Sequence, residues 1–197
     1  VDPVVTEIVR NGVIAVTEEM KTNLMRTAYN IIIYEALDFT TGLFTPQGET
    51  ISIGIGLPMF IRGMSETVKA KIRHFGPDGF APGDILLTND AYTTGSHLNH
   101  VTLTLPIFHQ GRLVAFSCCM AHWLDIGGNV PGGYNPQAVE SFQEGVLIPP
   151  VKLFRKGVIQ QDIVDILASN SRLPGSNWGD LNGQLNALDL GERRFHA

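Results

Sequence analysis

The stretch "VTLTLPIFHQGRLVAFSCCMAHW", residues 101–123, contains two runs of apolar and β-branched residues separated by the tetrapeptide "HQGR". Runs of this kind around a short glycine-containing turn predict a β-hairpin. If the hairpin turns at Gln110-Gly111, the positions of each cross-strand pair sum to about 221, so His100 lies opposite roughly residue 121. The hairpin therefore places His100 and His122 at the same end of two neighbouring strands.

Several other segments have clear secondary-structure patterns. A second hairpin is predicted for "LDFTTGLFTPQGETISIGIG", residues 37–56, with Pro46 and Gly48 in the turn. A buried strand is predicted for "PGDILLTND", residues 82–90, and helices for residues 3 to about 29, 65–75, 160–172 and 180–194. Because the strands come as hairpins and do not alternate regularly with helices, the expected fold class is α+β, an antiparallel hairpin-rich sheet packed against long helices.

The first predicted helix has a well-defined start and an apolar stripe. Asp2 is a suitable N-cap, and Pro3 is favoured at the first helical position. Apolar residues then recur at helical spacing, among them Val5, Ile8 and Val16. We expect this whole stripe to pack against the core.

The composition restricts the possible environments and partners. The net charge is −5, and no cluster of Lys and Arg is dense enough for nucleic-acid binding. The longest apolar stretches are far shorter than the roughly 20 residues needed to cross a membrane, and no signal-peptide pattern opens the chain. Cys118 and Cys119 are expected to be buried free thiols, which favours a cytoplasmic location. Charged residues make up only 17%, which indicates that more chain or partner subunits cover part of the surface.

Three histidines are candidates for a metal site. His97 and His100 precede the first strand of the central hairpin, and His122 ends the second. Their convergence beside the glycine-rich segment 124–137 would give a site with three imidazole ligands and an open position, as in catalytic zinc sites. The alternative is that His97 and His100 are polar residues of a loop, since two histidines at this spacing are common.

Carboxylates near these histidines extend the candidate site. Asp38 is a further ligand or, alternatively, a residue that caps a strand edge or turn, because a buried Asp is costly unless it is paired or binds metal. Asp125 is a candidate for orienting a histidine, and Glu144 for transferring a proton or, alternatively, for a solvated surface position. Asp90 is expected to cap a loop, and three other histidines are expected outside the site, namely His74, His109 and His196. The chain contains no nucleotide-binding glycine loop of a recognised pattern.

Four sequence blocks resemble the N-terminal part of the hydantoinase B/oxoprolinase family: "EALDFTTGLF", "TNDAYTTGSHLNHVTL", "AHWLDIGG" and "GDLNGQLNALDLGERR". Subunits of this family are longer, so the resemblance implies that residues 1–197 are the N-terminal part of a longer B-type subunit. It also implies a hydantoinase A-like partner that binds ATP. Together such subunits open cyclic amides such as hydantoins, 5-oxoproline or other lactams, and a related branch carboxylates ketones such as acetone and acetophenone.

The resemblance also implies a set of metal ligands. The family ligands match Asp38, His97 and His122, and the remaining family ligand is an Asp at the position of His100. Compared with the Asp of the family, an imidazole at position 100 gives the site one negative charge less. This change favours zinc as the divalent metal, with manganese as the alternative.

Three functions are consistent with these features. The first is hydrolysis, in which metal-bound water attacks a cyclic amide that the partner has activated with ATP. The second is the ketone carboxylase branch, in which the same site binds an activated carboxyl species and a ketone. The third is a non-catalytic assembly subunit, which the low charge fraction and the loss of the Asp ligand would fit.

Overall fold

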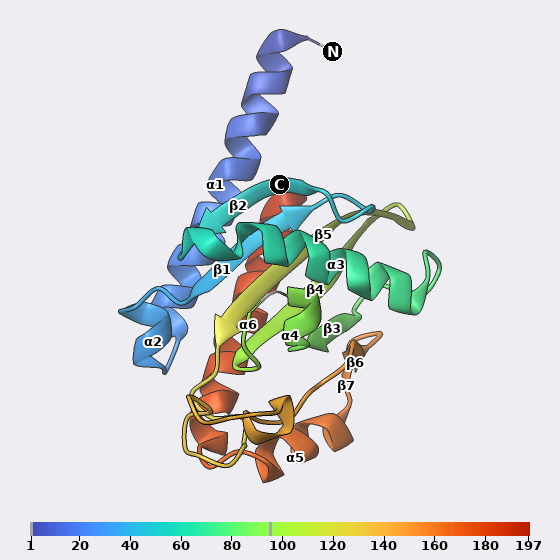
Figure 1. The fold of residues 1–197 in the computed structure, drawn as a ribbon. Helices are drawn as coiled ribbons and strands as arrows, with labels where there is room; N and C mark the ends of the chain where they lie inside the picture. Colours follow the sequence, from blue (N-terminus) through green and yellow to red (C-terminus); the bar gives the residue numbers. More distant parts are fainter. Residues whose placement is uncertain (1, 95) are drawn as a thin grey trace.

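A computed structural model describes residues 2–94 and 96–197 (Figure 1). Its centre is one seven-stranded sheet in the order β2-β1-β5-β4-β3-β6-β7, and all neighbouring strands are antiparallel. The strands are β1 (Phe39–Phe44), β2 (Thr50–Ile55), β3 (Ile85–Thr88), β4 (His100–His109), β5 (Arg112–His122), β6 (Val151–Arg155) and β7 (Val158–Ile159). Both predicted hairpins are present, and the α+β class is confirmed.

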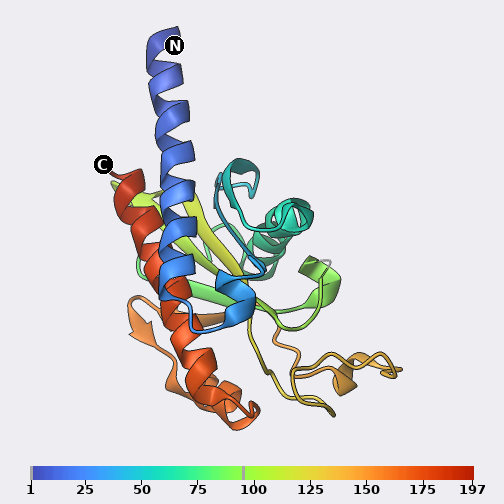
Figure 2. The ribbon, with the colours of Figure 1, turned by 90° about the vertical axis from the view of Figure 1, so that its left-hand side faces the viewer.

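The helices cover both faces of this sheet. They are α1 (Pro3–Thr27), α2 (Ile31–Tyr34), α3 (Ile61–Phe75), α4 (Ala91–Thr94), α5 (Gln161–Ser169) and α6 (Pro174–Phe195), with short 3-10 helices η1 (Pro58–Phe60) and η2 (Ser141–Gln143). The two long helices α1 and α6 lie side by side on one face, and α3 lies on the other (Figure 2). Within the described part of the chain, no helix combines the length and the apolar character needed to cross a bilayer.

The central hairpin has a change of register that the sequence analysis did not predict. Near the turn, His109 pairs with Arg112 as the simple rule predicts. An irregularity between Ile107 and Phe108 then shifts the pairing by one residue. As a result His100 pairs directly with His122 at the far end of the hairpin. The histidines are therefore closer in register than the sequence alone indicates.

Adjacent residues of β5 face two different cores. Cys119 belongs to the core under α1 and α6, whereas Cys118 belongs to the core under α3. Both thiols are free and fully buried, as predicted. Burial raises the pKa of both cysteines, so neither is a reactive thiolate at neutral pH.

The first helix differs from its prediction in its N-terminal half. The cap is as expected, because the Asp2 side chain accepts a hydrogen bond from the amide of Val4. The apolar stripe, however, is buried only from Val16 onward, and Val5 and Ile8 are exposed. Figure 1 shows the reason, which is that α1 is longer than the sheet and projects beyond it. The prediction that the whole stripe packs against the core was wrong for this half.

Small residues allow α1 and α6 to pack closely. On α6, glycine or alanine recurs every fourth residue along one side, at Gly179, Gly183, Ala187 and Gly191. A Cβ atom at Gly191 would lie 2.7 Å from the sulfur of Met20 and 2.5 Å from Ser117 Oγ. Since every fourth residue of a helix lies on one side, this spacing forms a continuous shallow surface for α1.

Buried polar groups join α6 to the rest of the fold. The Gln184 side chain donates to the carbonyls of Val101 and Cys119, and it accepts from the indole N–H of Trp123. Asp180 is fully buried, and its Oδ1 accepts from the amides of Tyr29 and Asn30. The last helix is therefore hydrogen-bonded to the strands of the central hairpin and to the segment that follows α1.

Two glycines of α6 provide a matched test of this packing. Gly191→Ala is expected to lower the free energy of unfolding by about 1–3 kcal/mol, because the new methyl group collides with buried neighbours. Gly175→Ala in the same helix meets open space and is expected to raise stability by about 0.4–1 kcal/mol. Chemical denaturation of both variants measures these changes. Equal effects at the two positions would contradict the close packing of Gly191 against Met20 and Ser117.

Candidate metal centre

The four predicted metal ligands meet at one end of the sheet. Asp38 immediately precedes β1, His100 is the first residue of β4, and His122 is the last residue of β5. These strands are neighbours in the order β1-β5-β4, and the antiparallel pairing brings these three ends together. His97 reaches the same point from the loop between α4 and β4.

The ligand atoms of this cluster are close enough to share one metal ion. One potential ligand atom from each of Asp38, His97, His100 and His122 lies within 4.8 Å of all the others. His100 Nε2 is 2.9 Å from one Asp38 oxygen, and His122 Nδ1 is 3.2 Å from the other. His97 Nε2 is 2.9 Å from His122 Nδ1. Tetrahedral zinc bound at about 2.0–2.1 Å requires ligand atoms about 3.4 Å apart, so small displacements would admit the ion.

The protonation states of the cluster suit metal binding. Burial raises the pKa of Asp38, but hydrogen bonds from His100 and His122 outweigh this effect and hold the pKa well below its usual value. Burial, together with the nearby histidines, lowers the pKa of His97 to about 4, and burial also lowers the pKa of His100. At neutral pH, Asp38 is therefore ionised and these two histidines are neutral, which are the forms that bind metals.

His100 has the most restricted surroundings of the three histidines. It is fully buried, and its ring packs edge-on against Phe60 of η1 with centroids 4.4 Å apart. Its Nδ1 is 2.5 Å from the hydroxyl of Ser96. A hydroxyl donates or accepts as needed, so Ser96 can donate to Nδ1 while Nε2–H faces Asp38, and can accept from Nδ1–H when Nε2 binds a metal.

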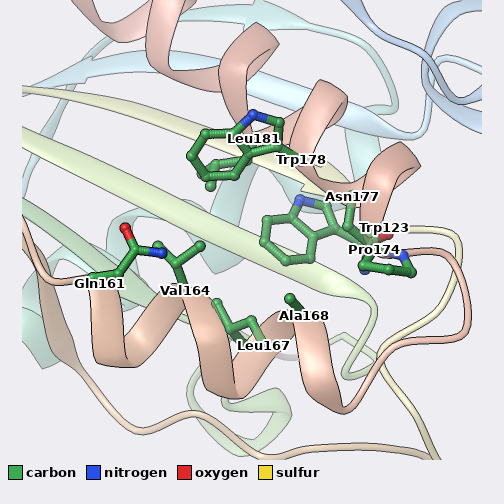
Figure 3. A pocket seen from close by; sticks show the side chains of 9 residues that line it. All are labelled: Trp123, Gln161, Val164, Leu167, Ala168, Pro174, Asn177, Trp178 and Leu181. Atoms are coloured by element: carbon green, nitrogen blue, oxygen red, sulfur yellow. The ribbon is translucent and has the colours of Figure 1, made fainter.

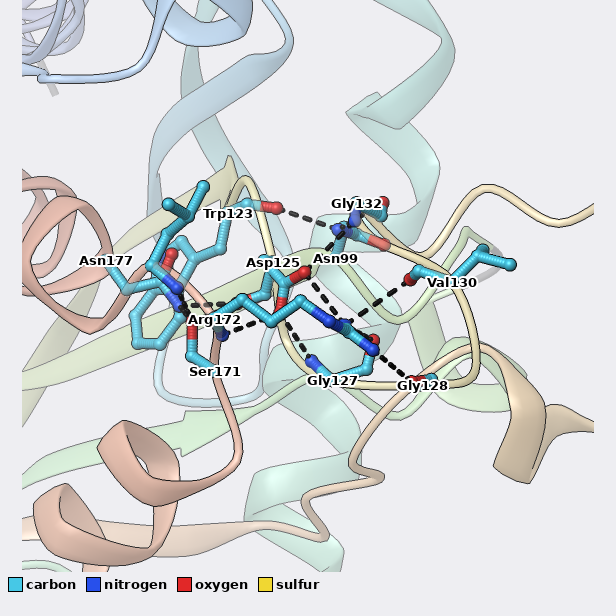
Figure 4. A network of polar contacts seen from close by, with 11 residues as sticks. Asn99, Trp123, Asp125, Gly127, Gly128, Val130, Gly132, Ser171, Arg172 and Asn177 are labelled. Carbon is cyan, nitrogen blue, oxygen red and sulfur yellow. Dashed lines mark hydrogen bonds and ion pairs between the residues drawn. The ribbon is translucent and has the colours of Figure 1, made fainter.

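Asp125, three residues after His122, lies in a network of polar contacts (Figure 4). Its carboxylate accepts from the amides of Gly127 and Gly132 and pairs with Arg172 at 3.0 Å. Burial raises the pKa of Asp125, but these hydrogen bonds outweigh it and keep the pKa below its usual value. In residues 2–94 and 96–197, its side-chain hydrogen bonds go to the glycine-rich loop and to Arg172 and not to the imidazoles of the cluster. Asp125 therefore shapes the loop beside the site.

Glu144 lines a pocket of about 270 Å³ that adjoins the loop carrying His97. The same pocket is lined by Tyr92 and by Leu98, the residue after His97. Glu144 is half-buried there. The other histidines, His74, His109 and His196, are exposed and lie outside the cluster, as expected.

A second pocket, of about 330 Å³, lies between α5 and α6 (Figure 3). Most of its lining is apolar and includes Trp123, which follows His122, and Trp178. The side chains of Trp123 and His100 have different neighbours. The indole N–H of Trp123 donates to Gln184 of α6, whereas the ring of His100 packs against Phe60 of η1. The pocket contains no residue of the cluster, so a group bound there would be separated from the predicted ligands.

Comparison with known proteins identifies the family. The family model described as hydantoinase B/oxoprolinase matches residues 2–197. The chain belongs to this family. It is 36% identical over 195 residues to the beta subunit of caprolactamase from Pseudomonas jessenii, covering 99% of this chain and 33% of that protein.

Other hydantoinase B relatives have lower identity over similar lengths. The 5-oxoprolinase 1 of Arabidopsis thaliana is 32% identical, covering 96% of this chain and 16% of that protein. The B-type subunit of a putative D-/L-hydantoinase from Pseudomonas sp. (strain NS671) is 30% identical, covering 99% of this chain and 34% of that protein. The chain therefore spans about a third, or less, of the length of these relatives.

Two solved structures share the fold. The crystal structure of ATP-dependent caprolactamase from Pseudomonas jessenii superposes with a TM-score of 0.94 at 36% identity, covering 100% of this chain and 34% of that chain. A nucleotide-free structure of acetone carboxylase gives a TM-score of 0.91 at 17% identity, covering 99% of this chain and 26% of that chain. The second likeness shows the fold alone, and it places the hydantoinase B fold in a carboxylase as well as in a lactamase.

Ser96 is a candidate site residue that the sequence analysis did not identify. It stands four positions before His100, and serine at this spacing has no distinctive pattern. Only the path of the loop, which brings its hydroxyl to the buried face of the imidazole, reveals the contact.

Ser96→Ala is expected to weaken zinc binding by about tenfold, because residues that orient metal-binding histidines usually contribute ten- to hundredfold to affinity. Competition titration against a zinc chelator measures this change. Ser176→Ala, in α6 and outside the cluster, is the control. Unchanged affinity in Ser96→Ala would show that the hydroxyl does not orient His100.

Proposed function

We propose that this chain is the metal-binding part of a B-type subunit in an ATP-dependent cyclic amide hydrolase. The observation that carries the proposal is the convergence of Asp38, His97, His100 and His122, so that one potential ligand atom from each lies within 4.8 Å of all the others. The proposed partner is a hydantoinase A-like subunit that binds ATP.

The relatives favour hydrolysis of cyclic amides over other reactions. The names caprolactamase, 5-oxoprolinase and hydantoinase each refer to a ring that contains an amide, and these relatives are 30–36% identical to this chain. The carboxylase is similar in fold at 17% identity. We therefore assign a lactam or imide as the substrate class, and a ketone with bicarbonate is the alternative to be tested.

Zinc is the metal that the donor atoms favour. Three imidazoles and one carboxylate supply more nitrogen than manganese or magnesium sites usually contain. With a divalent ion, the ionised Asp38 leaves the centre with one net positive charge. A site with a second carboxylate at position 100 would be neutral and better suited to manganese.

Each residue of the candidate site has a definite part in this proposal. Asp38 and the three histidines hold the metal, which when bound would supply Lewis-acid polarisation to the amide reaction. Glu144 lines the pocket beside Leu98 and would move a proton to or from the substrate nitrogen. Asp125 holds the glycine-rich loop in the conformation that borders the site. Activation by ATP on the partner is required because an unstrained amide is a poor electrophile.

Alanine substitution of two ligands tests the assignment. His97→Ala and His122→Ala are expected to reduce bound metal by at least tenfold and to abolish lactam-dependent ATP turnover in the assembled complex. Elemental analysis measures the bound metal, and an ATPase assay measures the turnover. The control is His109→Ala, because His109 is exposed and lies next to the hairpin turn.

The same assay distinguishes the alternatives. Metal content and turnover that remain unchanged would remove these residues from the site. ATP turnover that requires a ketone and bicarbonate would assign the carboxylase reaction. Metal absent from the wild-type complex would favour the assembly role.

His100→Asp tests the effect of the unusual ligand. The additional carboxylate is expected to shift the ratio of manganese to zinc affinity toward manganese by about tenfold, since harder oxygen ligands suit the harder ion. Competition titrations with both metals on wild type and variant measure the ratio. An unchanged ratio would mean that residue 100 does not contact the metal.

A further inference from the structure

The predicted metal ligands lie where regular strand pairing stops. Asp38 comes before β1, His100 opens β4, and His122 closes β5. Each of these residues therefore pairs with a neighbouring strand on one side at most. Other hydrogen bonds must fix the ligand-bearing segments, because buried amides and carbonyls need partners.

Asn30 completes a closed circuit of four hydrogen bonds that includes two ligands. Its Nδ2 donates to the carbonyl of His122 at 2.7 Å, and the amide of His122 donates to the carbonyl of Asp38 at 3.1 Å. The amide of Asp38 donates to the carbonyl of Ile32 at 3.0 Å, and the amide of Ile32 donates to Asn30 Oδ1 at 2.9 Å. Since Asn30 is fully buried, water does not compete for these bonds.

Asn99 extends the pairing of the central hairpin one step beyond the ligands. The amide of Trp123 donates to the carbonyl of Asn99 at 2.8 Å, and Asn99 Nδ2 donates back to the carbonyl of Trp123 at 2.8 Å. Asn99 directly precedes His100, and Trp123 directly follows His122. This reciprocal pair of hydrogen bonds therefore holds the two ligands from the side on which the ladder has ended.

Asn89 holds the remaining segment. Its Nδ2 donates to the carbonyls of Leu98 and Val146, each at 2.8 Å, and its Oδ1 accepts from the amide of Ile148 at 2.7 Å. Leu98 directly follows His97. Asn89 is fully buried just after the end of β3, so it ties this loop to the sheet.

We propose that Asn30, Asn89 and Asn99 are positioning residues that hold the metal-binding segments in place before a metal binds. This inference rests on the metal centre proposed above. A carboxamide suits the role because one side chain donates to a carbonyl and accepts from an amide. Leucine is similar in size and does neither. Partners that orient metal ligands typically contribute ten- to hundredfold to metal affinity.

The test is a cobalt(II) titration of the full chain, with visible absorption and chelator competition as readouts. Asn30→Leu, Asn89→Leu and Asn99→Leu are each expected to lower cobalt affinity at least tenfold. Asn177→Leu is the matched control. Asn177 is also buried and donates to a backbone carbonyl, that of Asp125 at 2.6 Å, but within the described residues its side chain donates only to Asp125 and Ser171, and not to a predicted ligand or its direct sequence neighbours. This control is expected to lose stability and keep its cobalt affinity.

The outcomes separate this inference from the proposed function. Cobalt binding by the wild type, with affinities in the three variants within twofold of it, overturns the positioning role alone. An equal loss of affinity in Asn177→Leu also overturns it, because the effect would then follow stability. A wild type that binds neither cobalt nor zinc overturns both proposals. If a leucine variant does not fold by circular dichroism, the smaller Asn→Ser change at that position is measured against Asn177→Ser.

Discussion

The direct pairing of His100 with His122 is the constraint on which the metal centre depends. Side chains of paired residues lie on the same face of a sheet, so this register brings two imidazoles together on the face that η1 covers. A shift of one residue would turn one of them to the opposite face, under α6. Asp38 then joins them because β1 pairs with β5, and Phe39 lies opposite Ala121.

The cluster ranges from exposed to buried, with His97 exposed, Asp38 and His122 half-buried and His100 buried. His100 is fully buried, and it is stabilised there by a carboxylate on one ring nitrogen and a hydroxyl on the other. A buried polar ring is costly without such partners. Burial lowers the pKa of this ring and favours its neutral form, and Asp38 Oδ1 lies 2.9 Å from Nε2, so the folded protein already holds both groups where one metal could bind them.

The sequence predicted the secondary-structure elements that depend on local residue patterns. The hairpins follow from alternating patterns around turn residues, and the approach of His100 to His122 follows from the position of one turn. The shift between Ile107 and Phe108 was not predicted, although Pro106, directly before Ile107, is a residue type that often accompanies an irregularity in a strand. The resemblance to the family supplied Asp38, whose chemistry alone left a capping role open.

Contacts between distant segments account for what the sequence did not reveal. Asp125 binds Arg172, 47 positions later, and nothing in either local pattern indicates this pairing. The exposure of Val5 and Ile8 depends on where the sheet ends relative to α1, which helical periodicity does not encode. Ser96 and the buried asparagines are ordinary loop residues in sequence, and their importance follows from which carbonyl or imidazole they reach.

The hydrogen bonds of α6 have a consequence for the order of assembly during synthesis. Asp180 binds the amide of Asn30 across 150 positions, and Gln184 binds the carbonyl of Val101 beside His100. Contacts so distant along the chain form late, since their closure must wait for the intervening residues. On a ribosome, the strands that carry the histidines are made well before α6. The segments beside the histidines therefore lack these hydrogen bonds until α6 has been made.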